Sequence, residues 1–150
     1  MGSMTAVFLG SYSPRLDEKG RLFLPAKYRD GLGEKVVLTK GPDRCVTIYP
    51  EAVFHARIAA RLASATTSSR SVRNLRRALL GQAADEAPDR QGRVTIPAPL
   101  RAYAGLDRDC TVVGQGDYVE VWDTAAYAEI EASSNLELDD LNADGEEFVF

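Results

Sequence analysis

Near its N-terminus, the chain alternates strand-like apolar segments with residues that favour turns. The strand-like segments occupy residues 7–16 and 21–24, on either side of a turn at residues 17–20. Gly20 can adopt the positive φ that a tight turn requires. The pattern predicts a β-hairpin, which Pro25 ends because proline cannot continue the strand ladder.

A second hairpin is predicted further along the chain. The β-branched runs at residues 36–39 and 45–49 flank the turn residues Gly41, Pro42 and Asp43. Runs of this kind, separated by turn residues, are typical of paired antiparallel strands.

Two short amphipathic helices are predicted, at residues 51–63 and 125–132, because apolar residues recur there at helical spacing. Their apolar faces consist of Phe54, Ile58 and Leu62, and of Ala126, Tyr127 and Ile130.

A third helix is predicted at residues 72–80. A Ser- and Thr-rich linker at residues 64–71 can cap its N-terminus, and Gly81 can end it. One face carries Val72, Leu75 and Leu79, and another carries Arg70, Arg73 and Arg77. We expect the apolar face to pack on the body of the protein with the arginines solvated; direct contact with nucleic acid is the alternative.

The first hairpin pattern occurs twice in the chain. Residues 16–26 recur as residues 88–98, and residues 41–49 recur as residues 114–122. The first match shares Asp17 with Asp89, Gly20 with Gly92, Arg21 with Arg93, Pro25 with Pro97, and Ala26 with Ala98. The chain therefore contains two repeats, at residues 8–55 and 81–128.

Each repeat is too small to bury an adequate core alone, so we expect the two to form one structural domain. Residues 56–80 would join them as linker helices, and residues 129–150 would form an acidic C-terminal helix or tail. We expect the acidic end of this segment to be a solvated, disordered tail; the alternative is that it covers a basic surface on a neighbouring subunit. In such a domain the two Asp-x-x-Gly-Arg turns, at residues 17–21 and 89–93, occupy equivalent surroundings.

The composition is that of an ordinary globular domain: 150 residues, 45% hydrophobic and 27% charged. No apolar run approaches the roughly 18 residues that span a bilayer, and the N-terminus lacks a signal-peptide pattern. We expect a cytoplasmic protein without a membrane partner.

The net charge of −4 conceals an uneven distribution. Residues 1–108 hold all 18 Lys and Arg against ten acids, a net charge of +8, whereas residues 109–150 hold twelve acids and no base. This asymmetry is typical of a surface that binds a polyanion, with a separate solubilising or partner-binding segment; an incidental imbalance is the alternative.

Catalytic and metal sites find little support in the sequence. Cys45 and Cys110 lie far apart in strand-like runs, and His55 is the one histidine, so these residues cannot supply the four ligands of a zinc site. We expect both cysteines to be small buried hydrophobes and His55 to be a structural or surface residue. No nucleotide-binding motif or catalytic triad pattern is present, so we expect neither an enzyme nor a cofactor.

The Asp-x-x-Gly-Arg turn has a chemistry of its own. Across a tight turn, the Asp17 carboxylate can accept hydrogen bonds from turn amides and orient the Arg21 guanidinium; Asp89 can do the same for Arg93. The planar guanidinium fork suits phosphate or the O6 and N7 acceptors of guanine. The alternative is that each Asp and Arg pair only fastens its hairpin.

Other cations surround the turns and are candidates for phosphate contacts, which position a protein on DNA without specifying sequence. They are Arg15, Lys19, Lys27 and Arg29 in the first repeat and Arg90 in the second.

The doubled Asp-x-x-Gly-Arg-apolar-x-apolar-Pro-Ala pattern resembles the MraZ family, the two-repeat members of the SpoVT/AbrB superfamily. The opening Phe8-Leu9-Gly10 and the strand ends Tyr49-Pro50 and Trp122-Asp123 share in this resemblance. It implies an α+β fold, in which two tandem repeats build a pseudo-twofold swapped-hairpin β-barrel with short peripheral helices.

The resemblance further implies a nucleoid-associated transcriptional regulator. It would act mainly as a repressor of its own division and cell-wall gene cluster, binding short direct repeats in double-stranded promoter DNA as a ring-shaped homo-oligomer. Arg21 and Arg93 would contact DNA, with Asp17, Gly20, Asp89 and Gly92 orienting the turns.

The second repeat lacks three cations of the first, since Lys19, Lys27 and Lys40 are replaced by Gln91, Pro99 and Val113. We therefore place the stronger DNA contacts on the first repeat. Two other functions stay open. One is an AbrB-type antitoxin whose acidic segment wraps a toxin, and the other is a ring scaffold that binds a protein through its tail and does not touch DNA.

Overall fold

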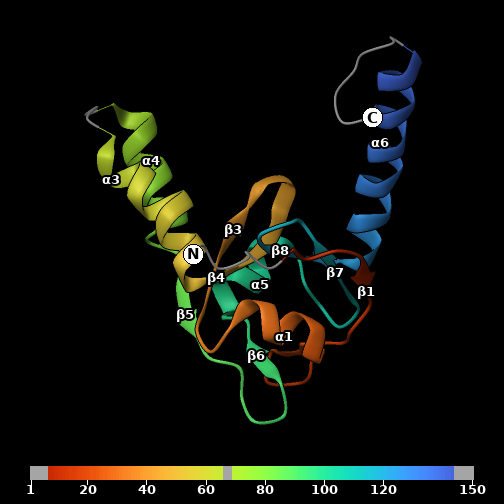
Figure 1. The fold of residues 1–150 in the computed structure, drawn as a ribbon, viewed down its shortest axis with the longest axis horizontal. Helices are drawn as coiled ribbons and strands as arrows, with labels where there is room; N and C mark the ends of the chain where they lie inside the picture. The colour runs from red at the N-terminus through yellow and green to blue at the C-terminus, as the bar shows by residue number, and fades with distance from the viewer. Residues whose placement is uncertain (1–6, 66–68, 144–150) are drawn as a thin grey trace, which may run out of the picture.

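The structure is a computed structural model that describes residues 7–65 and 69–143 (Figure 1). It is a mixed α+β fold with a six-stranded antiparallel sheet and a separate two-stranded sheet. In spatial order, the larger sheet contains β1 (Ser11–Tyr12), β7 (Cys110–Gly114), β8 (Val119–Asp123), β4 (Cys45–Pro50), β3 (Val36–Gly41) and β5 (Ala84–Glu86). The smaller sheet pairs β2 (Arg21–Phe23) with β6 (Arg93–Thr95).

Short helices connect these strands. They are α1 (Ala26–Leu32), the 3-10 turn η1 (Pro42–Arg44), α2 (Glu51–Phe54), the π-helical segment η2 (His55–Ala59), α3 (Ala60–Ser64), α4 (Arg70–Leu79), α5 (Ala98–Ala104) and the longer α6 (Thr124–Ala143). None of the helices within the described ranges is both long and apolar enough to cross a membrane.

The second hairpin prediction is confirmed in both repeats: β3 pairs with β4, and β7 pairs with β8. The first hairpin prediction is wrong in its pairing. β1 pairs with β7 and β2 with β6, so the strands beside each Asp-x-x-Gly-Arg turn join the other repeat rather than each other. This exchange buries Leu22 and Val94 completely in one common core, which two separate hairpins would leave half exposed.

Equivalent residues of the two repeats meet at the pairings between repeats. Leu22 pairs with Val94, its counterpart 72 residues later, and Thr47 pairs with Glu120, its counterpart 73 residues later. Pairs of this kind are expected where two repeats are related by an approximate twofold axis. The buried core also contains Cys45 and Cys110, as predicted from their apolar surroundings.

The first predicted strand is shorter than expected. Only Ser11–Tyr12 forms a ladder, with isolated bridges at Phe8 and Arg15. The interruptions fall where Gly10 has a φ of +81° and where Pro14 has no amide hydrogen to donate.

The helix predicted at residues 51–63 is formed by α2, η2 and α3, which run on without a break from Glu51 to Ser64. The predicted cap of the next helix is also present, since the Ser69 hydroxyl accepts a hydrogen bond from the Val72 amide at 3.3 Å. The expected packing of α4 on the body is wrong for most of its length. No α4 residue is buried, and the main attachment lies at its C-terminal end, where the Thr39 hydroxyl donates to the Leu79 carbonyl at 2.7 Å.

The expectation of a disordered acidic tail is wrong as far as Ala143, because the helix predicted at residues 125–132 continues to that residue as α6. Of the two forms expected for residues 129–150, helix or tail, the described part is helix. Residues 131–143 are rich in Ala, Leu and Glu, which favour helix, and contain neither Gly nor Pro. The remainder of that tail, with Glu146, Glu147, Phe148 and Phe150, lies outside the described residues.

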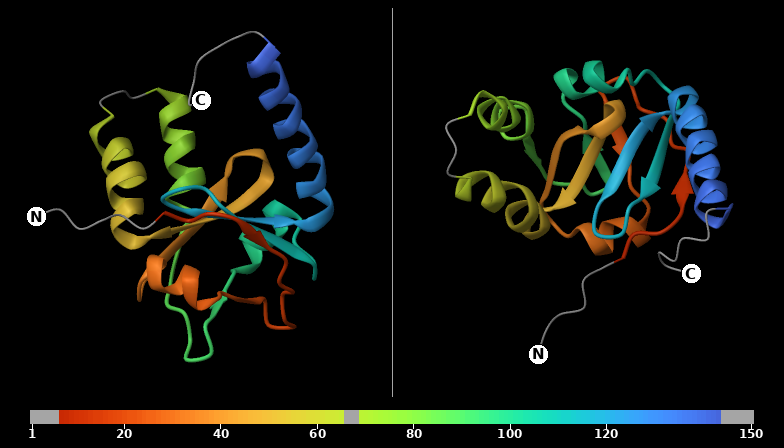
Figure 2. Two further views of the ribbon diagram at one scale, coloured as in Figure 1. Left: turned by 45° about the vertical axis from the view of Figure 1, so that its right-hand side comes forward. Right: turned by 90° about the horizontal axis from the view of Figure 1, so that it is seen from above.

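Two helical arms project from the body. The first, which we call the basic hairpin, consists of α3 and α4; the second, the acidic arm, is α6. Figures 1 and 2 show both arms leaving the body on the same side and standing apart, while the loops that carry the Asp-x-x-Gly-Arg turns lie at the opposite end.

Candidate nucleic-acid interface

Asp17 organises the first turn. Its Oδ1 accepts hydrogen bonds from the backbone amides of Lys19 and Arg21, each at 2.9 Å, and its Oδ2 accepts one from Nε of Arg21 at 2.7 Å. Gly20 closes the turn by donating its amide to the Asp17 carbonyl at 3.0 Å, with a φ of +76° that favours glycine.

The second turn repeats this arrangement bond for bond. Oδ1 of Asp89 accepts from the amides of Gln91 and Arg93, each at 2.9 Å, and Oδ2 accepts from Nε of Arg93 at 2.9 Å. Gly92 donates to the Asp89 carbonyl with a φ of +81°. Each arginine is thus fixed through Nε, which leaves its terminal nitrogens for other contacts.

The hydrogen bonds change the acidity of both carboxylates. The pKa of Asp17 is lowered chiefly because the Arg21 amide donates to the charged form, with further contributions from the Arg21 side chain and the Lys19 amide. The pKa of Asp89 is lowered in the same way by Arg93 and Gln91. Both groups are therefore charged at neutral pH, as the orientation of the arginines requires.

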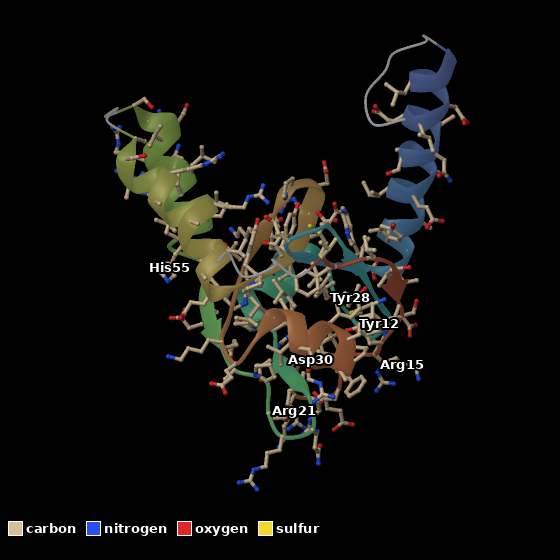
Figure 3. The ribbon with its side chains drawn as sticks, in the orientation of Figure 1. Tyr12, Arg15, Arg21, Tyr28, Asp30 and His55 are labelled. Carbon is tan, nitrogen blue, oxygen red and sulfur yellow. The ribbon has the colours of Figure 1, made fainter. Side chains whose placement is uncertain are left out.

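The pairing of β2 with β6 brings the two turns together. Nη1 of Arg93 lies 4.0 Å from Oδ2 of Asp17, and the backbone amide of Leu24 donates to the Gly92 carbonyl at 2.8 Å. In return, the Ile96 amide donates to the Gly20 carbonyl at 2.9 Å. Arg21 lies at this end of the molecule in Figure 3. The two turns accordingly form one unit, which we call the paired turns.

Arg29 and Arg101 pack against the paired turns and hydrogen-bond to the backbone beside them. Nε of Arg29 donates to the Leu24 carbonyl at 2.9 Å, and Nη1 of Arg101 donates to the Ile96 carbonyl. A Cβ added at Gly92 would lie 2.8 Å from Nε of Arg29, and one added at Gly20 would collide with the Arg101 guanidinium. The absence of a side chain at these two glycines is what lets each arginine lie under the turn of the other repeat.

Arg101 is absent from the residues predicted above, although Arg29 is among them. The signal was available, because Arg101 follows Arg29 by the repeat offset of 72. A cavity of about 450 Å³ beside the first turn is also lined by Arg101, together with Arg15, Asp17 and Arg108.

The other predicted cations lie in different places. Lys19 and Arg90 are exposed at the tips of the two turns. Arg15, labelled in Figure 3, is 70% exposed. Its Nε lies 3.0 Å from Oδ1 of Asp109. Lys27 lies apart from the turns, with Nζ 5.5 Å from the centre of the Tyr28 ring, whose hydroxyl donates to the carbonyls of Leu9 and Gly10.

The cysteines and the histidine offer no reactive group. Burial raises the pKa of the Cys110 thiol to about 11 and that of Cys45 further still. His55 is exposed beside the Phe54 ring. Across residues 7–65 and 69–143, no three His, Cys, Asp or Glu side chains gather as they would around a metal ion.

A family profile described as "MraZ protein, putative antitoxin-like" matches residues 7–77 and again residues 79–147. The chain belongs to the MraZ family. Proteins named "Transcriptional regulator MraZ" resemble it closely, and these names describe regulators, not enzymes. The match confirms the resemblance to the MraZ family that the doubled Asp-x-x-Gly-Arg motif indicated.

Three of these relatives illustrate how similar the chain is to named members of the family. The protein from Thermobifida fusca is 53% identical over 126 residues, which cover 84% of this chain and 87% of the relative. The protein from Micrococcus luteus is 54% identical over 121 residues, covering 81% and 84%. The protein from Frankia alni is 52% identical over 135 residues, covering 88% and 94%.

Proposed function

We propose that this MraZ family member is a sequence-specific DNA-binding transcriptional regulator whose paired turns contact DNA. The observation that carries the proposal is the pair of arginines, Arg21 and Arg93, held side by side by Asp17 and Asp89. A guanidinium that is already oriented loses less entropy on binding, and its fork matches phosphate or a guanine edge. The names of the relatives support a role in transcription.

Roles within the site follow from exposure and position. Arg21 and Arg93 would read bases, while the exposed Lys19 and Arg90 at the turn tips would contact phosphates. Arg15, Lys27 and Arg29 are further phosphate candidates, and Asp17, Gly20, Asp89 and Gly92 hold the turns. The first repeat would make the stronger contacts because it carries the exposed Lys19 at its turn, where the second has Gln91, and because Lys27 adds a cation elsewhere on this repeat, where the second has Pro99.

The proposed architecture is a pseudo-twofold swapped-hairpin β-barrel of the AbrB type. The pairing of Leu22 with Val94, and of β1 with β7, supports this exchange between repeats. Residues 8–55 and 81–128 would be the repeats, residues 56–80 the linker helices and residues 129–150 the acidic helix and tail.

The proposed working form is a ring-shaped homo-oligomer on promoter DNA that carries short direct repeats. One pair of turns makes few contacts and would bind weakly, with steep salt dependence. Several pairs held in one frame raise the effective concentration of each and select DNA with repeated boxes. The proposed targets are the division and cell-wall genes of its own cluster, mainly repressed, in the cytoplasm at the nucleoid.

A second candidate function is an antitoxin, which the description of the matching family favours. In that case the projecting α6 would bind a toxin while the paired turns bind DNA. Co-purification of a specific partner protein, released by removal of residues 124–150, would support this alternative.

The test of the proposed function is a binding titration on the DNA immediately upstream of the coding region, beside a scrambled fragment of equal length. We expect selective complexes on the upstream DNA, weakened by roughly tenfold or more when salt rises from about 50 to about 200 mM. Equal affinity for both fragments at matched salt would contradict sequence-specific binding.

A further inference from the structure

The basic hairpin carries a one-sided charge. Residues 52–84 contain six arginines and no Asp or Glu. The arginines are Arg57, Arg61, Arg70, Arg73, Arg76 and Arg77. Arg76 is partly buried and donates to the carbonyls of Leu62 and Ala65, which holds α3 against α4, whereas Arg61, Arg70 and Arg77 are exposed.

The acidic arm carries the opposite charge. All five of its acids are exposed, and no Lys or Arg occurs anywhere after residue 108. These acids are Glu129, Glu131, Glu137, Asp139 and Asp140. Twenty helical residues give the arm a length of about 30 Å, enough to lie along the whole basic hairpin.

Both arms also expose large apolar side chains. Leu136 on α6 is 64% exposed and Leu75 on α4 is 49% exposed. Burial of these leucines would add a hydrophobic contribution to a contact that the opposite charges of the two arms orient.

The two arms stand apart within one chain, and each has contacts at its base. Nη1 of Arg57 contacts both Asp117 oxygens, at 2.6 and 2.7 Å, and ties the root of the basic hairpin to the β7–β8 loop. At the root of α6, Oδ2 of Asp123 accepts from the Ala126 amide at 3.1 Å, and the Trp122 and Tyr127 rings lie in contact. From these roots the arms project separately from the body (Figures 1 and 2).

We infer that the acidic arm of one copy docks on the basic hairpin of a second copy. The inference deepens the homo-oligomer that is part of the proposed function, and rests on it. Both arms leave the body on the side away from the paired turns (Figure 2). Copies that dock side by side in the same orientation therefore present all their turns in one direction. DNA is the weaker candidate partner for the basic hairpin, since one straight duplex at the paired turns does not reach the opposite side of the body.

The test uses the full-length chain without DNA, with mass measured by light scattering during gel filtration at low salt. The acid-reversed variant is Glu137→Lys/Asp140→Lys, and the base-reversed variant is Arg70→Glu/Arg77→Glu. We expect the wild type to assemble and each variant to run at the mass of a single chain. The control variant is Asp30→Lys/Glu34→Lys, which makes the same change in net charge as the acid-reversed variant but lies outside both arms, on α1 and just after it. We expect the control to assemble like the wild type.

Mixing the two reversed variants supplies the sharpest result. In the mixture the two native arms match at one contact and the two reversed arms, with their charges exchanged, match at the next, so an equimolar mixture should regain the mass of the wild-type assembly. Assembly that survives both reversals, or a mixture that stays monomeric, would overturn the docking inference alone. A wild type that is monomeric at every concentration would overturn the proposed oligomer as well. If the base-reversed variant still assembled but lost DNA binding, the basic hairpin would be assigned to DNA instead.

Discussion

The guanidinium of Arg93 lies 4.0 Å from the Asp17 carboxylate that already holds Arg21 at 2.7 Å. One carboxylate from the first repeat therefore faces the arginines of both. This relationship exists because β2 pairs with β6 across the repeats. It makes the two turns a single structural unit, so a change in one turn is expected to disturb the other.

The lowered pKa values of Asp17 and Asp89 predict a dependence of stability on pH. A carboxylate whose pKa falls on folding stabilises the protein above its ordinary pKa of 3.8, and this contribution is lost as pH falls through the lower, folded value. We expect Asp17→Asn/Asp89→Asn to be less stable than the wild type at neutral pH, with the difference shrinking below pH 3.8. Urea unfolding at a series of pH values measures the free energy of unfolding of both proteins. Asp30→Asn/Asp43→Asn is the control for the change in net charge. A difference in the free energy of unfolding between the Asp17→Asn/Asp89→Asn variant and the wild type that stays constant with pH would contradict the prediction.

Gly92→Ala tests the support of the turns by Arg29. Gly92 has a φ of +81°, and a new Cβ would press on the Arg29 side chain. We expect a loss of about 1–3 kcal/mol in the free energy of unfolding from the backbone strain, together with weaker DNA binding. Gly33→Ala is the matched control because Gly33 has a φ of +84° with no atom within 4 Å of the added Cβ. It should lose similar stability but bind DNA normally, and equal DNA binding by both variants would count against a supporting role for Arg29.

Asp117→Asn tests how the basic hairpin is held. The Arg57 and Asp117 side chains are 48% and 32% exposed, so the pair should add no more than about 1 kcal/mol to global stability. We expect local loosening instead, seen as faster amide hydrogen exchange in η2, α3 and α4 with unchanged exchange in β3 and β4. Asp30→Asn serves as the control, and an unchanged exchange rate in the hairpin would show that the ion pair does not anchor it.

The repeat in the sequence predicted much of this structure. The offset of 72 between Asp17 and Asp89 predicted that the two turns are equivalent, and their hydrogen bonds agree atom for atom. Local signals were equally informative where the structure depends on local chemistry, as at the Ser69 cap and the hairpin of β3 and β4.

The sequence pattern could not predict which distant strands pair. A strand at residues 21–24 has the same alternation of apolar and polar residues whether it pairs with its neighbour in the chain or with a strand of the other repeat. Only the burial of Leu22 against Val94, seen in the folded structure, distinguishes the two pairings. The length of α6 was underestimated for a related reason. The exposed acids and leucines of α6 do not form an apolar stripe at helical spacing. Because the prediction relied on such a stripe, it ended the helix too early.

Arg93→Ala should weaken DNA binding less than Arg21→Ala does. Both arginines are held alike, but the first repeat carries Lys19 and Lys27 where the second has Gln91 and Pro99, against a single gain of Arg90 in place of Glu18 at the second turn. Loss of one good base contact corresponds to about 1–3 kcal/mol, or roughly five- to 150-fold in affinity. Titrations of both variants on the same upstream DNA measure the ranking, and a larger loss for Arg93→Ala would reverse the assignment of the stronger contacts.

The most direct test of the paired turns as the DNA-binding surface is the affinity of Arg21→Ala for the upstream DNA, measured at matched salt. Arg44→Ala is the control, because Arg44 lies in η1, at the end of the body away from the turns (Figure 1). We predict that Arg21→Ala retains its fold and assembly but binds upstream and scrambled DNA equally weakly, while Arg44→Ala stays selective. Selective binding by Arg21→Ala with wild-type affinity would contradict the account.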